Sequence, residues 1–175
     1  MGLLDVLNQY QHRQNPPPPH VFDDFDRVAR EADPEDIGYG LEEAFNDDDT
    51  PPFEEMVGQL YDRSDDDTRA GLLNEIVNSL GGGQAVATAA GGGLLGGVLG
   101  DLMRRRQGRQ TLGPRDARNI PASDIQAAAR EAKLQNPGVV QKISRFYARN
   151  PQMVQVLGQA ALSILMSGMA RRRRM

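Results

Sequence analysis

Apolar residues recur at intervals of three and four along much of this chain, in stretches separated by prolines, glycines or runs of aspartate. Such spacing places the apolar side chains on one face of an α-helix, whereas a half-buried strand would need strict alternation. One stretch carries Phe53, Met56, Val57, Leu60 and Tyr61, and another carries Val139, Val140, Ile143, Phe146 and Tyr147. The pattern predicts an all-α fold.

Composition narrows both the core and the chemistry. Tryptophan is absent and aromatic residues make up 5% of the 175 residues, so the core must consist mainly of Leu, Val, Ile, Ala and Met. The absence of cysteine excludes disulfides, thiolate metal sites and a cysteine nucleophile, and it is typical of a reducing compartment. Because the opening MGLLDVLNQ has no basic region before a hydrophobic run, we expect no signal peptide and a cytoplasmic location.

Breaks in the helical pattern predict five segments. They are an N-terminal arm with a proline-rich linker at 1–20, an acidic helical unit at 21–80, a glycine- and arginine-rich connector at 81–120, a helical unit at 121–170 and a basic tail at 171–175. Four prolines, Pro16 to Pro19, favour an extended polyproline segment, which predicts a semi-rigid linker, with a docking strip for a partner as the alternative. We expect the N-terminal arm before it to be mobile. The final helix is predicted as one piece from about residue 151 to about residue 170.

The two helical units resemble each other. LYDRS at 60–64 is echoed by RFYARN at 145–150, which pairs Tyr61 with Tyr147 and Arg63 with Arg149. We predict two similar three-helix units of roughly 45 residues, a size at which a lone core is marginal. Each tyrosine is expected to place its ring in the core and its hydroxyl in water, and each arginine to neutralise carbonyls at a helix end. Chance similarity between helices is the alternative.

Charge divides the chain in two. Residues 1–80 hold twenty Asp and Glu against five Arg, a net charge of −15, whereas residues 81–175 hold fifteen Lys and Arg against four acids, a net charge of +11. Opposite charges attract, so we predict partner-binding clusters in both halves. The acidic clusters are Asp47, Asp48, Asp49, Asp65, Asp66 and Asp67, and the basic clusters are Arg104, Arg105, Arg106, Arg109, Arg171, Arg172, Arg173 and Arg174. No aromatic residues are interleaved with the arginines, which argues against nucleic acid as the partner. Solvated charge runs are the alternative.

No pattern predicts catalysis. His12 and His20, the only histidines, flank the proline run, which offers no rigid shell for a catalytic triad or a metal site. The aspartate runs lack the alternating acids and the fixed glycine of a calcium loop. We therefore predict no catalytic, cofactor or metal site and no enzymatic activity.

Two uncharged stretches raise a membrane alternative. Residues 84–100 are uncharged and glycine-rich, and residues 151–170 carry no charge before four arginines, an arrangement typical of a C-terminal anchor. A lipid-facing helix has no need of a polar stripe, whereas a core helix with one exposed edge does. Such a stripe is present in the final helix and favours the core helix: Gln152, Gln155, Gln159, Ser163 and Ser167.

The MGLLD start, the LLNEIVNSLGGG transition and the glycine-rich middle resemble the YidB-like bacterial family, although the family's Ser-Trp-x-Gly segment has no counterpart here. The resemblance implies an all-helical fold and no catalytic residues. Together these observations predict a non-enzymatic interaction or self-assembly protein, a homo-oligomer or the binder of a protein partner, in which an acidic half binds a basic half. The alternative is a peripheral or tail-anchored protein that binds an anionic membrane surface.

Overall fold

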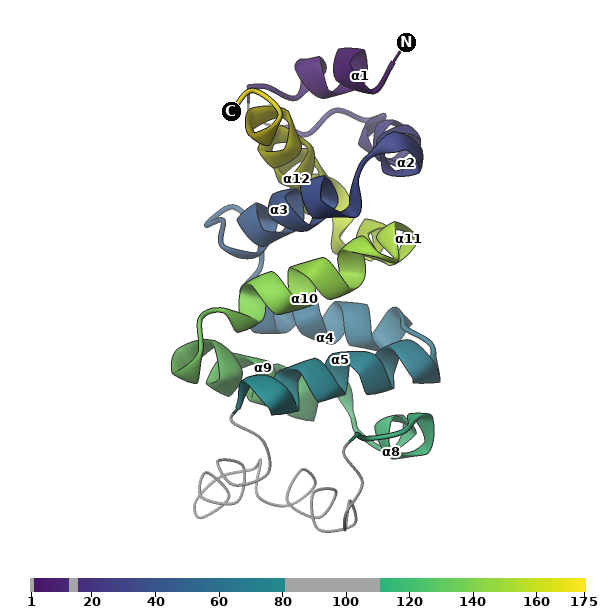
Figure 1. Ribbon diagram of the computed structural model, residues 1–175, viewed down its shortest axis with the longest axis vertical. Helices are drawn as coiled ribbons and strands as arrows, with labels where there is room; N and C mark the ends of the chain where they lie inside the picture. The colour runs from purple at the N-terminus through teal and green to yellow at the C-terminus, as the bar shows by residue number, and fades with distance from the viewer. Residues whose placement is uncertain (1, 13–15, 81–110) are drawn as a thin grey trace. The chain divides into compact units, whose positions relative to one another are not determined.

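The computed structural model describes residues 2–12, 16–80 and 111–175 (Figure 1). The described residues form α-helices and one short 3₁₀ turn, and none of them lies in a strand, so the all-α prediction is confirmed. Most of the predicted connector, including Arg104, Arg105, Arg106 and Arg109, lies outside the described residues.

The helices of the first half are α1 (Leu3–Gln9), α2 (Val21–Glu31), α3 (Pro34–Phe45), α4 (Phe53–Arg63) and α5 (Asp66–Ser79). Those of the second half are α8 (Pro114–Arg118), α9 (Ala122–Gln135), α10 (Val139–Ala148), α11 (Pro151–Val154), the 3₁₀ turn η1 (Gln155–Leu157) and α12 (Gly158–Arg172).

The chain forms two compact units that do not follow the order of the sequence. Unit 1 combines residues 1–52 with residues 140–175, and unit 2 is the continuous stretch 53–139. Unit 1 therefore contains α1, α2 and α3 together with α10, α11, η1 and α12, whereas unit 2 contains α4, α5, α8 and α9. Each unit thus mixes helices from the two stretches, 21–80 and 121–170, that the sequence pattern groups as separate units.

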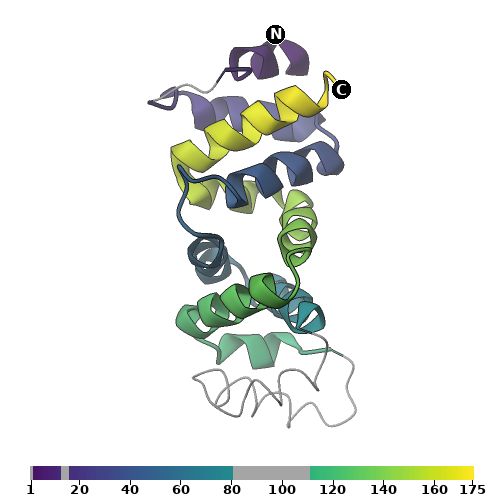
Figure 2. The ribbon, with the colours of Figure 1, turned by 90° about the vertical axis from the view of Figure 1, so that its left-hand side faces the viewer.

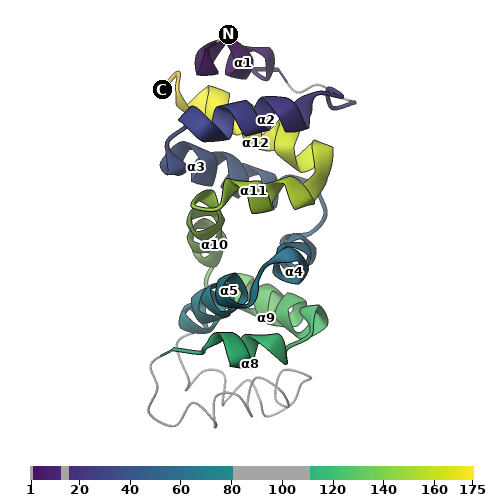
Figure 3. The same ribbon diagram turned by 90° about the vertical axis from the view of Figure 1, so that its right-hand side faces the viewer.

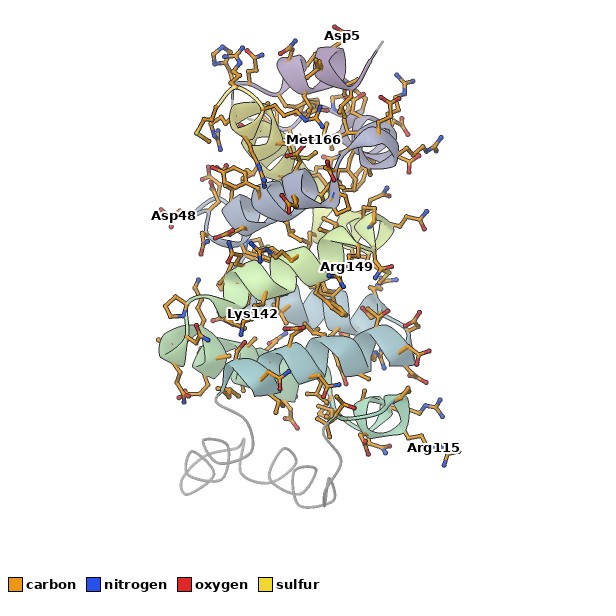
Figure 4. All side chains as sticks on the ribbon, viewed as in Figure 1. Asp5, Asp48, Arg115, Lys142, Arg149 and Met166 are labelled. Atoms are coloured by element: carbon orange, nitrogen blue, oxygen red, sulfur yellow. The ribbon has the colours of Figure 1, made fainter. Side chains whose placement is uncertain are left out.

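Helix α12 is the centre of unit 1. It packs against α1, α2 and α3, and Figures 2 and 3 show these neighbours beside it. Every residue from 161 to 170 is buried, and Met166 lies inside the unit (Figure 4). Ser163 and Ser167, expected on a wet edge, are buried as well, because the surrounding helices leave α12 no exposed face over this length.

The N-terminal arm contributes one of these neighbours. Helix α1 contacts α2 and α12, and it buries Val6, Leu7 and Tyr10. The Tyr10 hydroxyl donates a buried hydrogen bond of 2.7 Å to Oδ2 of Asp24 in α2. The arm was expected to be mobile, but its apolar residues and this hydrogen bond hold α1 on the unit.

The crossing of α3 and α12 is unusually close because both helices place a glycine there. A Cβ atom built on Gly40 would lie 2.3 Å from the carbonyl oxygen of Leu165, and one built on Gly168 would lie 3.1 Å from the Cα of Gly40. A side chain at position 40 would require the backbone to move, and one at position 168 would displace the side chain of Glu43, whose Oε2 lies 2.8 Å from such a Cβ, and press on Gly40. The close approach brings the charged side chains that flank the crossing within reach of each other.

The final helix is interrupted rather than continuous. Gly158 has φ of 89° and ψ of 177°, so the chain ends α11 and η1 and begins α12 with a change of direction. This backbone conformation is open to glycine and disfavoured for other residues. The single helix expected over 151–170 is therefore split by one residue.

Unit 2 is built on α9, which packs against α4 and α5, while α8 packs on α5. The side chain of Asp65 caps α5 by accepting a hydrogen bond from the amide of Thr68 at 2.8 Å. Asn74 of α5 binds the backbone of Leu112 twice, accepting from its N–H at 2.8 Å and donating to its carbonyl at 2.9 Å. These bonds fix the chain just before α8.

Candidate interaction surface

Three of the four tail arginines bind acids of α3 within unit 1. Arg171, in the last turn of α12, pairs with Glu43, and Arg172 pairs with Glu35 at 3.2 Å. Arg172 and Arg173 both reach Asp36, at 3.4 Å and 2.9 Å. We call these ion pairs together the α3–α12 seam. Its arginine side chains are 29–45% exposed, so each pair is partly screened by water.

Tyr39 of α3 joins the seam. Its hydrogen bond to Glu43, together with the charge of that carboxylate, raises the pKa of the Tyr39 hydroxyl. The guanidinium of Arg172 lies 5.5 Å from the centre of the Tyr39 ring, within the range of a cation–π contact. The arginines therefore bind α3 through an aromatic face as well as through carboxylates.

Unit 2 contains the same kind of pairing between distant parts of the chain. Arg118 of α8 binds Asp66 of α5, with an Nε–Oδ2 distance of 3.0 Å, and Arg130 of α9 binds Glu54 of α4 at 3.0 Å. Burial opposes ionisation of Glu54, but hydrogen bonds from the backbone and Arg130 outweigh it and lower the pKa of this carboxyl.

In each ion pair of the seam and in both of these pairs, the acid comes from residues 1–80 and the base from residues 111–175. The charge division seen in the sequence is therefore used inside the folded chain. Opposite charges meet between the two halves in unit 1 and again in unit 2.

The predicted acidic clusters have mixed roles. Asp47, Asp48 and Asp49 lie in the loop after α3, where the amide of Asp49 donates to the side chain of Asp47 at 3.0 Å. Asp48 is exposed and its side chain points away from the helices (Figure 4). The loop therefore presents negative charge to solvent while fixing its own turn.

The acids of the second cluster, Asp65 to Asp67, have three different roles. Asp65 caps α5, and the hydrogen bond from Thr68 lowers the pKa of its carboxyl. Asp66 is engaged by Arg118, and Asp67 is exposed in the first turn of the same helix. On the basic side, Arg174 follows the three seam arginines and is exposed.

Tyr61 and Tyr147, the tyrosines paired in the sequence, are both buried, and their hydroxyls do not face water as expected. Tyr61 donates a buried hydrogen bond to the carbonyl of Ala117 in α8, and burial raises the pKa of Tyr61 to about 12. Tyr147 packs edge-on against Phe146, with ring centres 5.2 Å apart. The Tyr61 hydroxyl was expected in water, but a hydroxyl buried by a neighbouring helix needs a protein acceptor.

The carbonyls at the end of α4 are also neutralised, although by a different arginine. Arg69 of α5 donates to the carbonyls of Tyr61 and Asp62, both at 2.9 Å, and its guanidinium lies 5.0 Å from the Tyr61 ring centre. Arg63 and Arg149, to which this role was assigned, are exposed.

Sequence reasoning missed the acids that hold the tail and the glycines that allow it to approach. Glu35, Asp36 and Glu43 follow i, i+1 and i+8 spacing on α3, which places them on one side of the helix with Gly40. Two glycines inside a helical pattern without a turn, at 38 and 40, were the available signal of a close helix crossing.

Two further features of the described part of the chain concern metal binding and membrane insertion. No group of three His, Asp or Glu side chains there is arranged to hold a metal ion. One helical stretch there, Pro151–Arg172, is long and apolar enough to cross a membrane, and 67% of an apolar 18-residue part of it is buried within the protein. Burial of this kind is equally typical of the core helix of a soluble fold.

Comparison with protein-family models, curated proteins and solved structures finds no significant match to this chain.

Proposed function

We propose that this chain is a non-enzymatic interaction protein that binds copies of itself, or an oppositely charged protein partner, by pairing an acidic surface with a basic one. The observation that carries the proposal is the source of the ion pairs: acids of residues 1–80 meet bases of residues 111–175 in both compact units. The acidic half of one molecule is complementary in charge to its own basic half, and it is equally complementary to the basic half of a second molecule.

The groups left for a second molecule are the exposed ones. Asp48 and Asp67 face solvent on the acidic side, and Arg174 does so on the basic side. The sequence adds the basic run Arg104, Arg105, Arg106 and Arg109. In this proposal the acidic surface of one molecule binds the basic run or the tail of another, and such head-to-tail contacts extend into open chains.

We also propose that the chain is a tandem repeat whose two copies have exchanged helices. The first copy would be α3, α4 and α5, and the second α9, α10 and α11–α12. Unit 1 then holds the first helix of one copy with the later helices of the other, and unit 2 holds the converse. In support, the chain passes between units after residue 52 and after residue 139, next to the start of the second helix of each copy.

Light scattering against ionic strength tests the proposed self-association. We expect the apparent mass of the full chain to exceed that of one 19.2 kDa molecule at low salt and to fall as salt is added. A variant with Arg104, Arg105, Arg106 and Arg109 changed to Gln should associate less, whereas Arg115→Gln, an exposed arginine outside the clusters, serves as the matched control. A monomer at low salt and high concentration would contradict the proposal.

A second candidate function is association with an anionic membrane, which the apolar stretch Pro151–Arg172 and the arginines at its end favour. Flotation of the full chain with anionic liposomes and with neutral ones tests it. Binding to the anionic vesicles alone, lost on removal of residues 151–175, would support membrane association, and absence of flotation by the full chain would end it.

A further inference from the structure

Unit 1 is assembled from two pieces of the chain, and unit 2 from one. Residues 1–52 and residues 140–175 build unit 1, although the 87 residues of unit 2 separate them in the sequence. The contacts that complete unit 1 are therefore contacts between two segments, and nothing in their chemistry requires both segments to belong to one molecule.

The two segments are oppositely charged. Residues 1–52 contain thirteen acids and three arginines, a net charge of −10. Residues 140–175 contain seven Lys and Arg and no acid, a net charge of +7. Residues 53–139, by contrast, hold eleven acids and ten bases, a net charge of −1. Repulsion within each segment of unit 1 is relieved when they combine. Unit 2 also divides by charge, with a net charge of −5 over residues 53–80 and +4 over residues 81–139, but its two parts belong to one continuous stretch.

Contact between the segments is specific as well as attractive. Helix α3 of the first segment lies beside α12 of the second (Figure 2), and the two backbones meet at Gly40 and Gly168. The seam then pairs the acids of α3 with Arg171, Arg172 and Arg173. A glycine crossing fixes where the helices meet, and the ion pairs fix which ends lie together.

We infer that the α3–α12 seam is an interaction surface for a second copy of this chain, in which residues 1–52 of each molecule complete unit 1 on residues 140–175 of the other. This inference rests on the proposed function, since it supplies the surface and the partner for self-association. It differs in form, because two molecules that exchange segments close into a dimer instead of extending as a chain.

Two short connections would act as hinges in such an exchange. The chain leaves the first segment through NDDDTPP, residues 46–52, and enters the second after Asn136-Pro137-Gly138. Each contains proline, which fixes its own φ at about −65° and holds the residue before it in an extended conformation. In folded unit 2 the second connection is a tight turn, in which the N–H of Val139 donates to the carbonyl of Asn136 at 3.0 Å, and exchange would require this turn to open. In dilute solution the two segments of one molecule meet at a higher effective concentration than segments of different molecules, so the monomer is favoured. Exchange dominates when pairing within one molecule is made unfavourable.

Reversing the charges on one side of the α3–α12 seam makes pairing within one molecule unfavourable. An acid-reversed variant carries Glu35→Lys, Asp36→Lys and Glu43→Lys, and a base-reversed variant carries Arg171→Glu, Arg172→Glu and Arg173→Glu. Each variant alone has like charges across its own seam. In a 1:1 mixture, refolded together from urea, only exchange between the two variants restores opposite charges at both seams. The matched control is one chain with all six changes, which restores the pairing inside a single molecule.

At a dilution where the unaltered protein is a monomer, we expect the mixture to give a complex of twice the chain's mass by light scattering, containing both variants, and the sixfold control to remain a monomer. A mixture in which both variants keep the mass of one chain, beside a folded sixfold control, would overturn the inference. In that case salt-sensitive association of the unaltered protein would leave the proposed function standing, so the two failures are distinguishable.

A second measurement decides the matter if the sixfold control does not fold. Two unaltered chains with different affinity tags are refolded together at high concentration, and one tag is captured. Recovery of the second tag in a complex of two chains supports exchange, and its absence from every dimer fraction overturns it. A chain mixed only after separate refolding should not exchange on the same timescale, since exchange requires unit 1 to open.

Discussion

Single methyl groups are expected to matter where α3 crosses α12. Gly40→Ala would place a Cβ atom 2.3 Å from the carbonyl oxygen of Leu165, and a backbone atom cannot move aside cheaply. We expect this substitution to lower the free energy of unfolding by about 1–3 kcal/mol, as overpacking does in tight cores. Urea denaturation followed by circular dichroism measures the change.

Gly38 of the same helix provides the matched control. A Cβ atom there would make ordinary contacts of 3.7 Å with Arg145 and Ala148 of α10. Gly38→Ala should therefore keep or raise stability, by up to about 1 kcal/mol, because alanine is the better helix former. Equal effects of the two substitutions would contradict the close crossing.

Tyr61 is expected to make the protein sensitive to alkali. Its pKa is raised by burial from 10.0 to about 12, so the folded state favours the neutral phenol. The resulting stability is complete below about pH 10, where the unfolded chain also keeps the proton, and it is lost as the pH rises toward about 12. Urea midpoints measured up to about pH 11 should fall, and Tyr61→Phe should flatten the decline. Parallel declines in the two proteins would rule out this origin.

At the residue scale, the sequence predicted which side chains are buried and which kinds of contact they make, but not which residues they contact. Burial of Tyr61 and Tyr147 follows from helical spacing, which is local. The acceptor for Tyr61 lies at Ala117, 56 residues away, and the arginine at the end of α4 comes from the next helix rather than from α4 itself. Such choices depend on which helices meet, and no local pattern encodes them.

At the element scale, one glycine divides the last helical stretch. Gly158 has φ of 89°, and no atom lies within 4 Å of a Cβ built there, so only backbone strain opposes a side chain. We expect Gly158→Ala to cost about 1–3 kcal/mol of unfolding free energy, the usual range for a residue held in a sparsely populated conformation.

Gln159→Ala is the control for this prediction. Gln159 is exposed in the adjacent position, so its replacement should change stability by no more than about 0.5 kcal/mol. If Gly158→Ala proved equally neutral, α12 would extend through this position as a continuous helix.

The break also weakens the membrane candidate. Helix α12 has 15 residues, which at about 1.5 Å each span roughly 22 Å, less than the roughly 30 Å of a bilayer core. The sequence pattern predicted α12 as a core helix from a polar stripe. That stripe is incomplete, since Ser163 and Ser167 are buried. The sequence did not predict that the N-terminal arm packs on α12, because this packing depends on helices that are distant in the sequence.

At the scale of the whole molecule, stability should depend on salt. The seam joins segments of charge −10 and +7, and its partly exposed pairs are worth at most about 1 kcal/mol each. We expect the free energy of unfolding to fall by about 1–3 kcal/mol between about 50 mM and about 500 mM NaCl, as the screening length shortens. Urea titrations at both salt concentrations measure the difference.

A variant with Arg171, Arg172 and Arg173 changed to Gln should be less stable at low salt and should lose much of this dependence. Arg27→Gln, which lies in α2 outside the seam, serves as the control and should keep the full dependence. A salt response that is the same in all three proteins would place its origin elsewhere.

The sequence predicted the helices and the division of charge, but not the grouping of helices into units. Periodicity identifies α3, α4, α9 and α12 because it reports what each segment buries. It does not report the partner, and the partners here are distant: α3 packs on α12 and α4 on α9. The charge division was the one long-range signal available, and it indicated that the halves would combine without indicating where.

The division of unit 1 into two separated segments has a consequence for synthesis. Once residue 52 has left the ribosome, the 87 residues of unit 2 must follow before residue 140 is made, a delay of about 4 to 17 s at ordinary translation rates. During that delay the glycine and acid face of α3 has no partner to cover it, because α12 has not yet been made. If chains exchange segments as inferred above, the spacing of ribosomes on one messenger RNA would set how often residues 1–52 of one nascent chain meet residues 140–175 of a neighbour before those of their own chain.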